Sequence, residues 1–121
     1  MQITCFLLFL IASLYAMMGV ESAPIEARGS MSGRATYYNV GLGSCGKTNS
    51  DGEMVAALSG SFMSKKYCGR SITVKGGKGS VTVKVVDTCP GCGKGDVDLS
   101  PAAFKKLGAL SKGVIPITWS L

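Results

Sequence analysis

The sequence contains no histidine, and it has only seven acidic residues against thirteen lysines and arginines. The missing histidine excludes histidine-based general bases, catalytic triads that need an imidazole, and zinc–histidine sites. No Asn-x-Ser/Thr sequon is present, so N-glycosylation is not expected. Because acidic residues are so scarce, the stretch where they gather is the place to look for a polar site.

Three of the seven acids fall in one stretch near the C-terminus: Asp87, Asp96 and Asp98. Asp87 follows an apolar run and precedes the cysteine pair of Cys89-Pro-Gly-Cys92. Asp98 comes just before Ser100-Pro101, which is typical of a helix start because serine caps the first turn and proline suits its first position. The sequence therefore predicts two carboxylates at the ends of neighbouring elements.

The first twenty residues are almost continuously apolar and are followed by the small residues Ser22 and Ala23. This pattern predicts a secretory signal peptide over residues 1–22, with cleavage after Ser22 or Ala23, a short disordered leader over 23–32 and a folded domain over 33–121. The alternative is a membrane anchor, but no basic flank fixes such a span. We therefore expect a secreted, extracellular protein with no membrane association after cleavage.

The net charge of +6 lies entirely after residue 20. A basic exported domain favours anionic partners such as acidic polysaccharide, cell wall or phospholipid, and export argues against nucleic acid. The alternative is that the lysines only keep a small domain soluble. The domain has fewer than 100 residues, so its core is modest and disulfides are expected to support it.

Hydrophobic alternation predicts a mainly β domain. The firmest element is a hairpin with strands 71–75 and 80–86 around a glycine-rich loop, in which Val74 faces Val81. The remaining expected elements are strands over 33–38, 54–58 and 114–121, a helical turn within 59–66 and a helix over 102–107. In the last strand, Trp119 alternates with Ile115 and Ile117, which favours a place in the core. Five or six short strands and one helix indicate a small β-barrel.

Four cysteines remain once the signal peptide has removed Cys5: Cys45, Cys68, Cys89 and Cys92. The hairpin register places Cys68 near Cys89, which favours the disulfides Cys68–Cys89 and Cys45–Cys92. The alternative pairs Cys45 with Cys68 and lets the Cys-Pro-Gly-Cys turn close on itself. A redox motif or a zinc site is not expected, because the surrounding pattern lacks a following helix and a second Cys-x-x-Cys.

Five ordered motifs cover the predicted domain: GRATYY, GLGSCG, YCGR, VVDTCPGC and DVDLSPAAF, with a final ITW. Together they resemble the expansin-related double-psi β-barrels, and most of all the small fungal loosenin-like proteins. Barwin-like domains, plant natriuretic peptides and the bacterial rare lipoprotein A domain are similar in wider outline. The resemblance implies a mainly β, six-stranded double-psi β-barrel with one or two short helices.

The resemblance also implies a polysaccharide groove. Asp98 matches the family's acid position, and Asp87, eleven residues earlier, matches a second groove carboxylate. Thr36 and Tyr38 match groove-facing positions of the first strand. The position of the hydrolytic base is occupied by Asn39, which cannot take up a proton, whereas glycoside hydrolysis ordinarily needs two carboxylates. Asn39 is therefore expected only to help bind substrate.

The expected function is non-hydrolytic loosening of cell-wall polysaccharide, cellulose or chitin, by a monomer that needs no cofactor and no metal. Two alternatives remain. The barrel also hosts interaction proteins, such as protease inhibitors, natriuretic peptide-like signals and effectors. A lone acid such as Asp98 can also support a lytic transglycosylase, in which a hydroxyl of the sugar itself attacks.

Overall fold

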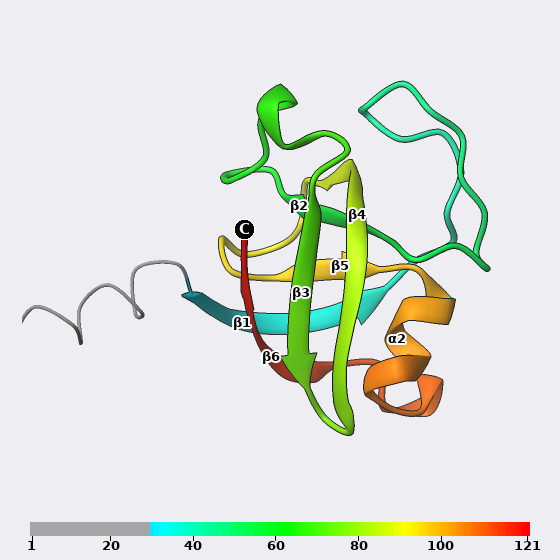
Figure 1. Ribbon diagram of the computed structural model, residues 1–121, viewed down its shortest axis with the longest axis vertical. Helices are drawn as coiled ribbons and strands as arrows, with labels where there is room; N and C mark the ends of the chain where they lie inside the picture. The colour runs from blue at the N-terminus through cyan, green and yellow to red at the C-terminus, as the bar shows by residue number, and fades with distance from the viewer. Residues whose placement is uncertain (1–29) are drawn as a thin grey trace, which may run out of the picture. The chain divides into compact units, whose positions relative to one another are not determined.

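The computed structural model describes residues 30–121; the predicted signal peptide and most of the predicted leader lie outside these residues. Six strands close into a barrel in the order β1-β5-β2-β4-β3-β6 (Figure 1). Their bounds are β1 Ser30–Tyr37, β2 Val55–Ser59, β3 Ser71–Gly76, β4 Gly79–Cys89, β5 Val97–Leu99 and β6 Ile115–Ser120. One helix, α2 (Pro101–Leu107), and two 3₁₀ turns, Lys65–Tyr67 and Leu110–Lys112, complete the fold. The prediction of a small, mainly β barrel is confirmed.

Two parallel strand pairs distinguish this barrel from a series of hairpins. β1 pairs in parallel with β5, and β2 pairs in parallel with β4, while β2–β5, β3–β4 and β3–β6 are antiparallel. Parallel neighbours need long crossover connections. The β2–β4 pair is accordingly connected through the 3₁₀ turn Lys65–Tyr67 and β3. The connection between β1 and β2 projects from the barrel at the upper right of Figure 1.

The predicted hairpin is confirmed in its register, because Val74 lies opposite Val81. Gly76 pairs with Gly79, so the loop has two residues, and Gly77 takes a positive φ of 51° there. Such a backbone favours glycine, which has no Cβ to clash. The hairpin sequence therefore determines its own turn.

Two strand boundaries differ by three residues from the sequence-based expectation, and one strand was not predicted. β1 begins at Ser30, inside the predicted leader, and β4 continues beyond residue 86 to Cys89. The pattern also gave no strand at β5, whose three residues are too few to show alternation. Pairing with β2 accounts for both the extension of β4 and the existence of β5.

The barrel interior is apolar. The side chains of β6 alternate as predicted, and Trp119 is 3% exposed within the core. Its indole Nε1 donates a hydrogen bond of 2.8 Å to the carbonyl of Gly95, which satisfies the one polar group of the ring. The core prediction for Trp119 is confirmed.

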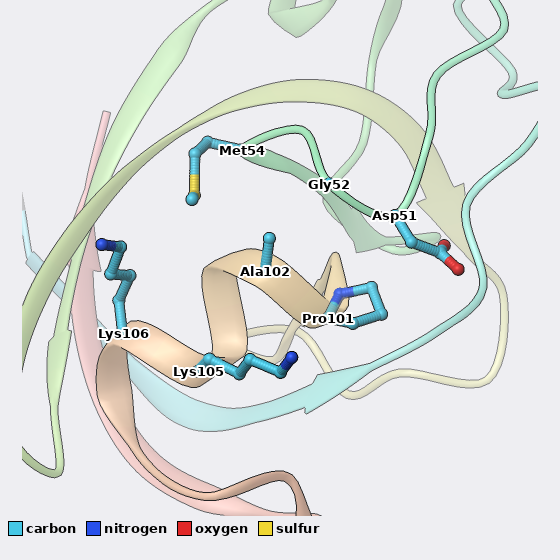
Figure 2. Close-up of a pocket in the computed structure, with 7 residues that line it drawn as sticks. All are labelled: Asp51, Gly52, Met54, Pro101, Ala102, Lys105 and Lys106. Atoms are coloured by element: carbon cyan, nitrogen blue, oxygen red, sulfur yellow. The ribbon is translucent and has the colours of Figure 1, made fainter.

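Helix α2 forms where Ser100 and Pro101 predict it. The Oγ of Ser100 accepts a hydrogen bond from the backbone N–H of Ala103, and Phe104 and Leu107 are fully buried. The opposite side of α2 faces the loop before β2, including Met54 (Figure 2). Within residues 30–121, no helix has the length and apolar character needed to cross a membrane.

Candidate functional site

A row of four residues crosses four adjacent strands. Thr36 in β1 lies opposite Asp98 in β5, Asp98 lies opposite Ala57 in β2, and Ala57 lies opposite Asp87 in β4. Residues directly opposite one another in a sheet share a face, and neighbouring strands lie about 4.8 Å apart. The two aspartates are therefore about 10 Å apart at their Cα atoms. We call Thr36, Asp98, Ala57 and Asp87 the carboxylate row.

Asp87 reaches this row through an irregularity in β4. Val85 pairs with Ala56 and Asp87 pairs with Ala57, so Val86 is an extra residue in the ladder. Strict alternation after the core residue Val85 would direct Asp87 into the barrel. The bulge at Val86 instead places the carboxylate on the outer face, which is how bulges re-aim side chains beside functional sites.

Asp98 is half-buried and anchored by its neighbour. The Oγ1 of Thr36 donates a hydrogen bond of 2.8 Å to Oδ1 of Asp98. Burial raises the pKa of Asp98 above its ordinary value, the negative charge of Asp87 adds to the rise, and the bond from Thr36 opposes it. Burial therefore favours the protonated, acid-like form of Asp98.

Asp87 is held by backbone donors. Its Oδ1 accepts hydrogen bonds of 2.8 Å from the N–H of Ser44 and 2.7 Å from the N–H of Thr88. The hydroxyls of Ser44 and Thr88 lie 2.7 Å apart and bond to each other. These bonds tie the β1–β2 connection to the end of β4. Within residues 30–121, Oδ2 of Asp87 has no hydrogen-bond partner.

Tyr38 is close enough to both aspartates for their negative charges to act on its phenol. Burial raises the pKa of its phenol to about 12, and the charges of Asp87 and Asp98 contribute to that rise. The hydroxyl is buried and has no hydrogen-bond partner among the described residues. Tyr37 points to the opposite face of the chain from Tyr38, as strand alternation predicts. Its ring centroid lies 4.8 Å from that of Phe104.

The predicted disulfide pairing is wrong. Instead of Cys68–Cys89 and Cys45–Cys92, the structure contains Cys45–Cys68 and Cys89–Cys92, the alternative left open by the sequence. Cys92 donates its N–H to the carbonyl of Cys89, so the Cys-Pro-Gly-Cys segment turns back on itself.

The other pair forms beside the bulge in β4. The N–H of Cys45 bonds to the carbonyl of Val86, and the N–H of Gly69 bonds to that of Val85. The hairpin register does not extend to Cys68, because β3 begins only at Ser71 and Gly69 turns the chain with a φ of 81°. Cys45 and Cys68 therefore meet at the same point of β4.

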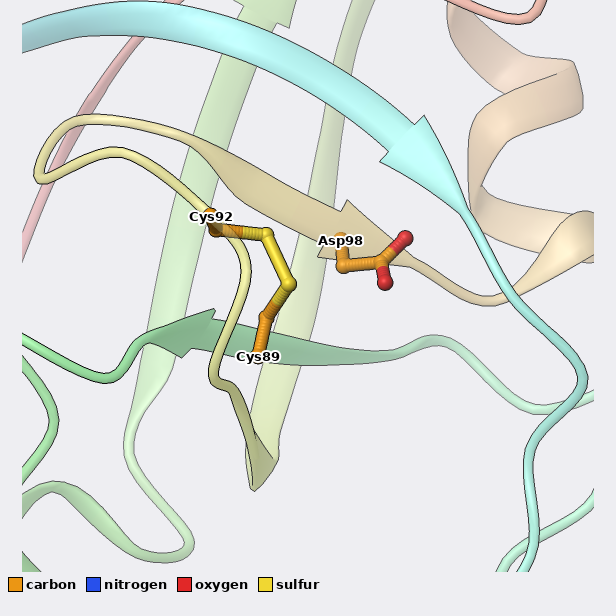
Figure 3. A group of neighbouring side chains, drawn as sticks. All are labelled: Cys89, Cys92 and Asp98. Carbon is orange, nitrogen blue, oxygen red and sulfur yellow. A yellow bond between two sulfur atoms is a disulfide. The ribbon is translucent and has the colours of Figure 1, made fainter.

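The Cys89–Cys92 disulfide forms one wall of the site. Its sulfur atoms and a carboxylate oxygen of Asp98 all lie within 4.8 Å of one another (Figure 3). Metal binding at such a cluster would require thiolates, and sulfurs bonded to each other are not thiolates. In this state the disulfide contributes shape to the site, not metal ligands.

The structure brings together four of the five predicted site residues: Thr36, Tyr38, Asp87 and Asp98. Asn39 is exposed and adds no carboxylate to the row. Sequence reasoning missed Ala57, which is 2% exposed and carries only a methyl group between the two aspartates. No local signal marks Ala57, because its role comes from pairing with two distant strands.

The arrangement suits hydrogen bonding to a hydroxyl-rich ligand. Asp87 offers acceptor oxygens and Asp98 can hold or release a proton, while Tyr38 carries an unpaired but buried hydroxyl beside them. Because Oδ1 of Asp87 is committed to two backbone N–H groups, the site does not display two equivalent free carboxylates.

Comparison with known proteins gives concordant matches. A family model described as lytic transglycolase matches residues 30–119. The papain inhibitor of Streptomyces mobaraensis is 34% identical over 111 residues, covering 84% of this chain and 78% of the inhibitor. Expansin-YoaJ of Bacillus subtilis (strain 168) is 41% identical over 68 residues, covering 56% of this chain and 25% of that expansin.

Solved structures agree with these relatives. The expansin of Clavibacter michiganensis is 37% identical with a TM-score of 0.68, covering 74% of this chain and 48% of that one. A mutant of the same expansin, solved in complex with cellohexaose, matches equally well. The Streptomyces papain inhibitor is 33% identical with a TM-score of 0.67, covering 75% of this chain and 92% of the inhibitor. The predicted expansin-like double-psi β-barrel is thereby confirmed.

Proposed function

The chain belongs to the lytic transglycolase family of expansin-like double-psi β-barrels, and we propose that it binds a β-linked cell-wall polysaccharide, cellulose or chitin, along the carboxylate row and loosens it without hydrolysis. The observation that carries this proposal is the row itself, with Tyr38 and the two aspartates converging on one face. The Clavibacter michiganensis expansin in complex with cellohexaose supports a glucan as the ligand. The expansins are longer chains, so their activity enters here as part of the proposal.

The proposed mechanism uses hydrogen bonds in place of bond cleavage. A glycan lying across β1, β5, β2 and β4 would present its hydroxyls to Asp98, Tyr38 and Asp87. Each bond made to the protein replaces a bond between neighbouring chains of the wall, and charge-assisted bonds to carboxylates are the stronger kind. Hydrolysis would need a second carboxyl group that activates the attacking water. Oδ1 of Asp87 is engaged by two backbone N–H groups, and Asn39 stands where the family's base would be.

The test compares Asp98→Asn with the unmodified protein on cellulose and on chitin. We expect the variant to keep its fold and to lose binding and loosening, with no reducing sugar released by either protein. Glu53→Gln is the matched control, because it removes one negative charge from an exposed residue outside the row. Loosening by Asp98→Asn equal to that of the unmodified protein would remove Asp98 from the site.

Product analysis tests the non-hydrolytic part of the proposal. Mass spectrometry of soluble fragments from glucan, chitin and peptidoglycan should find none above background. Fragments with anhydro-sugar ends would instead establish a lytic transglycosylase, in line with the description of the family.

A second candidate function is inhibition of a papain-like cysteine protease. It is favoured by coverage, because the match spans 78% of the Streptomyces mobaraensis inhibitor but only 25% of the Bacillus subtilis expansin. A titration of papain activity with the purified protein tests it. Stoichiometric inhibition that survives in Asp98→Asn, together with no retention on cellulose or chitin, would favour the inhibitor over the loosening protein.

We further propose that residues 1–22 are a signal peptide and that the protein is exported and monomeric. The apolar run and the two disulfides of the barrel support export. N-terminal sequencing of protein collected from the culture medium should begin just after Ser22 or Ala23. Light scattering of the same sample should give the mass of one chain.

A further inference from the structure

A second feature suited to binding lies beside α2, and it includes none of the carboxylate row. A groove of about 550 Å³ runs between this helix and the loop before β2 (Figure 2). Seven residues line it: Asp51, Gly52, Met54, Pro101, Ala102, Lys105 and Lys106. Its floor is apolar and consists of Pro101, Ala102 and Met54, and its charged groups stand at the edges. We call it the α2 groove.

The lysines of the α2 groove are not neutralised by acids of the barrel. Lys105 and Lys106 are exposed in the last turn of α2. Among residues 30–121, the ion pair that the structure shows joins Arg34 to Asp96 and involves neither lysine. The ammonium groups of both lysines are therefore free to meet an anion.

Other basic residues gather near the same end of α2. The N–H of Lys78 donates a hydrogen bond of 2.8 Å to the carbonyl of Leu107, so the β3–β4 turn rests on the end of the helix. The side chain of Lys112 passes close to Gly108, where an added Cβ would lie 3.6 Å from its Cδ. Positive charge thus extends beyond the groove and attracts a polyanion more than a single small anion.

Asp51, the acidic residue that lines the α2 groove, has a structural role. The Oδ1 of Asp51 accepts a hydrogen bond of 2.7 Å from the N–H of Val40, and its carbonyl accepts one of 3.2 Å from the N–H of Ala102. Figure 2 shows its carboxylate at the far end of the groove from Lys106. Asp51 therefore holds the loop against the start of α2 and leaves the lysine end positive.

We propose that the α2 groove binds an acidic polysaccharide built of uronic acid units. The apolar face of a sugar ring fits the shallow floor of Pro101, Ala102 and Met54, and uronate carboxylates pair with Lys105 and Lys106. Of the seven lining residues, Met54 alone has a bulky apolar side chain, whereas a membrane-inserting face carries several. The inference goes beyond the proposed function, because it adds an anionic anchor that does not use Asp98.

The test measures binding of the purified protein to polygalacturonate and to its fully methyl-esterified form, which keeps the sugar rings and removes the charge. The variant Lys105→Gln/Lys106→Gln should bind polygalacturonate about fivefold to tenfold more weakly, as expected for the loss of two exposed ion pairs. The matched control Lys65→Gln/Lys94→Gln removes the same charge from exposed positions elsewhere and should bind normally. Ala102→Glu, which places a carboxylate on the floor, should also weaken binding.

Several results would overturn the proposal. Equal losses in the two double variants would mean that overall charge, not the α2 groove, binds the polymer. Equal binding of the methyl ester would remove the role of the carboxylates. Binding to phosphatidylserine vesicles without binding to polygalacturonate would identify a lipid surface instead. Asp98→Asn should bind polygalacturonate normally, so failure of the proposed function and failure of this proposal are distinguishable.

Discussion

Thr36 donates its side-chain hydrogen bond directly across the β1–β5 ladder to Asp98, a residue 62 positions later in the chain. The bond fixes one oxygen of Asp98 and leaves the carboxyl half-buried beside Asp87 and Tyr38. Two opposing influences therefore act on the same group: burial favours its protonated form, and the Thr36 hydroxyl favours its ionised form.

Asp98→Asn should stabilise the protein at pH 7 and change nothing at pH 3. Burial is the main cause that raises the native pKa of Asp98 above the unfolded value of about 3.9. The native state therefore binds the proton more tightly than the unfolded state does. The free energy of unfolding falls as the pH rises from the unfolded pKa through the native pKa, and below the unfolded pKa the ionisation of Asp98 costs no stability. Asparagine cannot ionise, and its oxygen can still accept from Thr36. Urea unfolding should show a gain of under about 1 kcal/mol, because solvent screens a half-exposed carboxyl.

Glu53→Gln provides a control that should change the free energy of unfolding in the opposite direction. The hydrogen bond from the backbone of Ser50 holds the pKa of Glu53 below its ordinary value, so this carboxylate contributes stability above its unfolded pKa and loses it as the pH falls. The Gln variant should be slightly less stable at neutral pH and indistinguishable in acid. Lower stability of Asp98→Asn at pH 7 would contradict the burial argument.

Tyr38 should ionise at a higher pH than an ordinary tyrosine. Burial, with the charges of Asp87 and Asp98, raises the pKa of its phenol to about 12. Ultraviolet titration of the protein should show a tyrosinate step near that pH, and Tyr38→Phe should abolish that step alone. Because the hydroxyl has no partner within the described barrel, the Phe variant should keep its stability while it binds glycan more weakly. A clear loss of stability would mean that the phenol is a structural group.

The two disulfides should differ in their effect on stability. Cys45–Cys68 links residues 23 apart and Cys89–Cys92 links residues 3 apart. Loop-closure entropy then predicts losses of about 3 kcal/mol and about 2 kcal/mol when each pair is replaced by serine. Thermal unfolding measures both losses, and non-reducing peptide mapping checks the pairing first. Only the Cys89→Ser/Cys92→Ser variant should also alter glycan binding, since that disulfide borders Asp98.

Gly43→Ala should disturb the site, whereas Gly41→Ala should not. A Cβ on Gly43 would lie 2.3 Å from the carbonyl oxygen of Val86, so the β1–β2 connection would have to shift away from the bulge. The adjacent Ser44, whose N–H holds Asp87, would move with it. At Gly41 a Cβ would meet nothing within 4 Å. Melting temperature and glycan retention measure the effect, and equal behaviour of the two variants would contradict it.

Several elements were predictable because their signals are local. The β3–β4 hairpin has alternation and glycines at its turn, and α2 has Ser100 and Pro101 at its start. Trp119 could be assigned to the core because β6 alternates over its whole length. Each of these signals lies within one short stretch of the chain. The motifs also contained most of the site, since Asp87 and Asp98 stand out among so few acids.

The disulfide pairing and the geometry of the row were decided by long-range contacts. The register of the hairpin was right, but extending it past Ser71 gave the wrong partner for Cys68, because Gly69 turns the chain away. The extra residue Val86 directs Asp87 outward, although alternation after Val85 points it inward. A bulge is set by which strands pair, and here the pairing strand β2 is far away in the sequence.

The sequence by itself determined the class of fold, the elements with local patterns, and the chemical kind of residue available for a site: two isolated carboxylates, a tyrosine, and no histidine. The tertiary structure alone decided that Thr36, Asp98, Ala57 and Asp87 form one row and that α2 faces a basic groove. The reason is physical: hydrophobic period and turn chemistry act over neighbouring residues, whereas barrel closure brings together parallel strands that no local pattern relates.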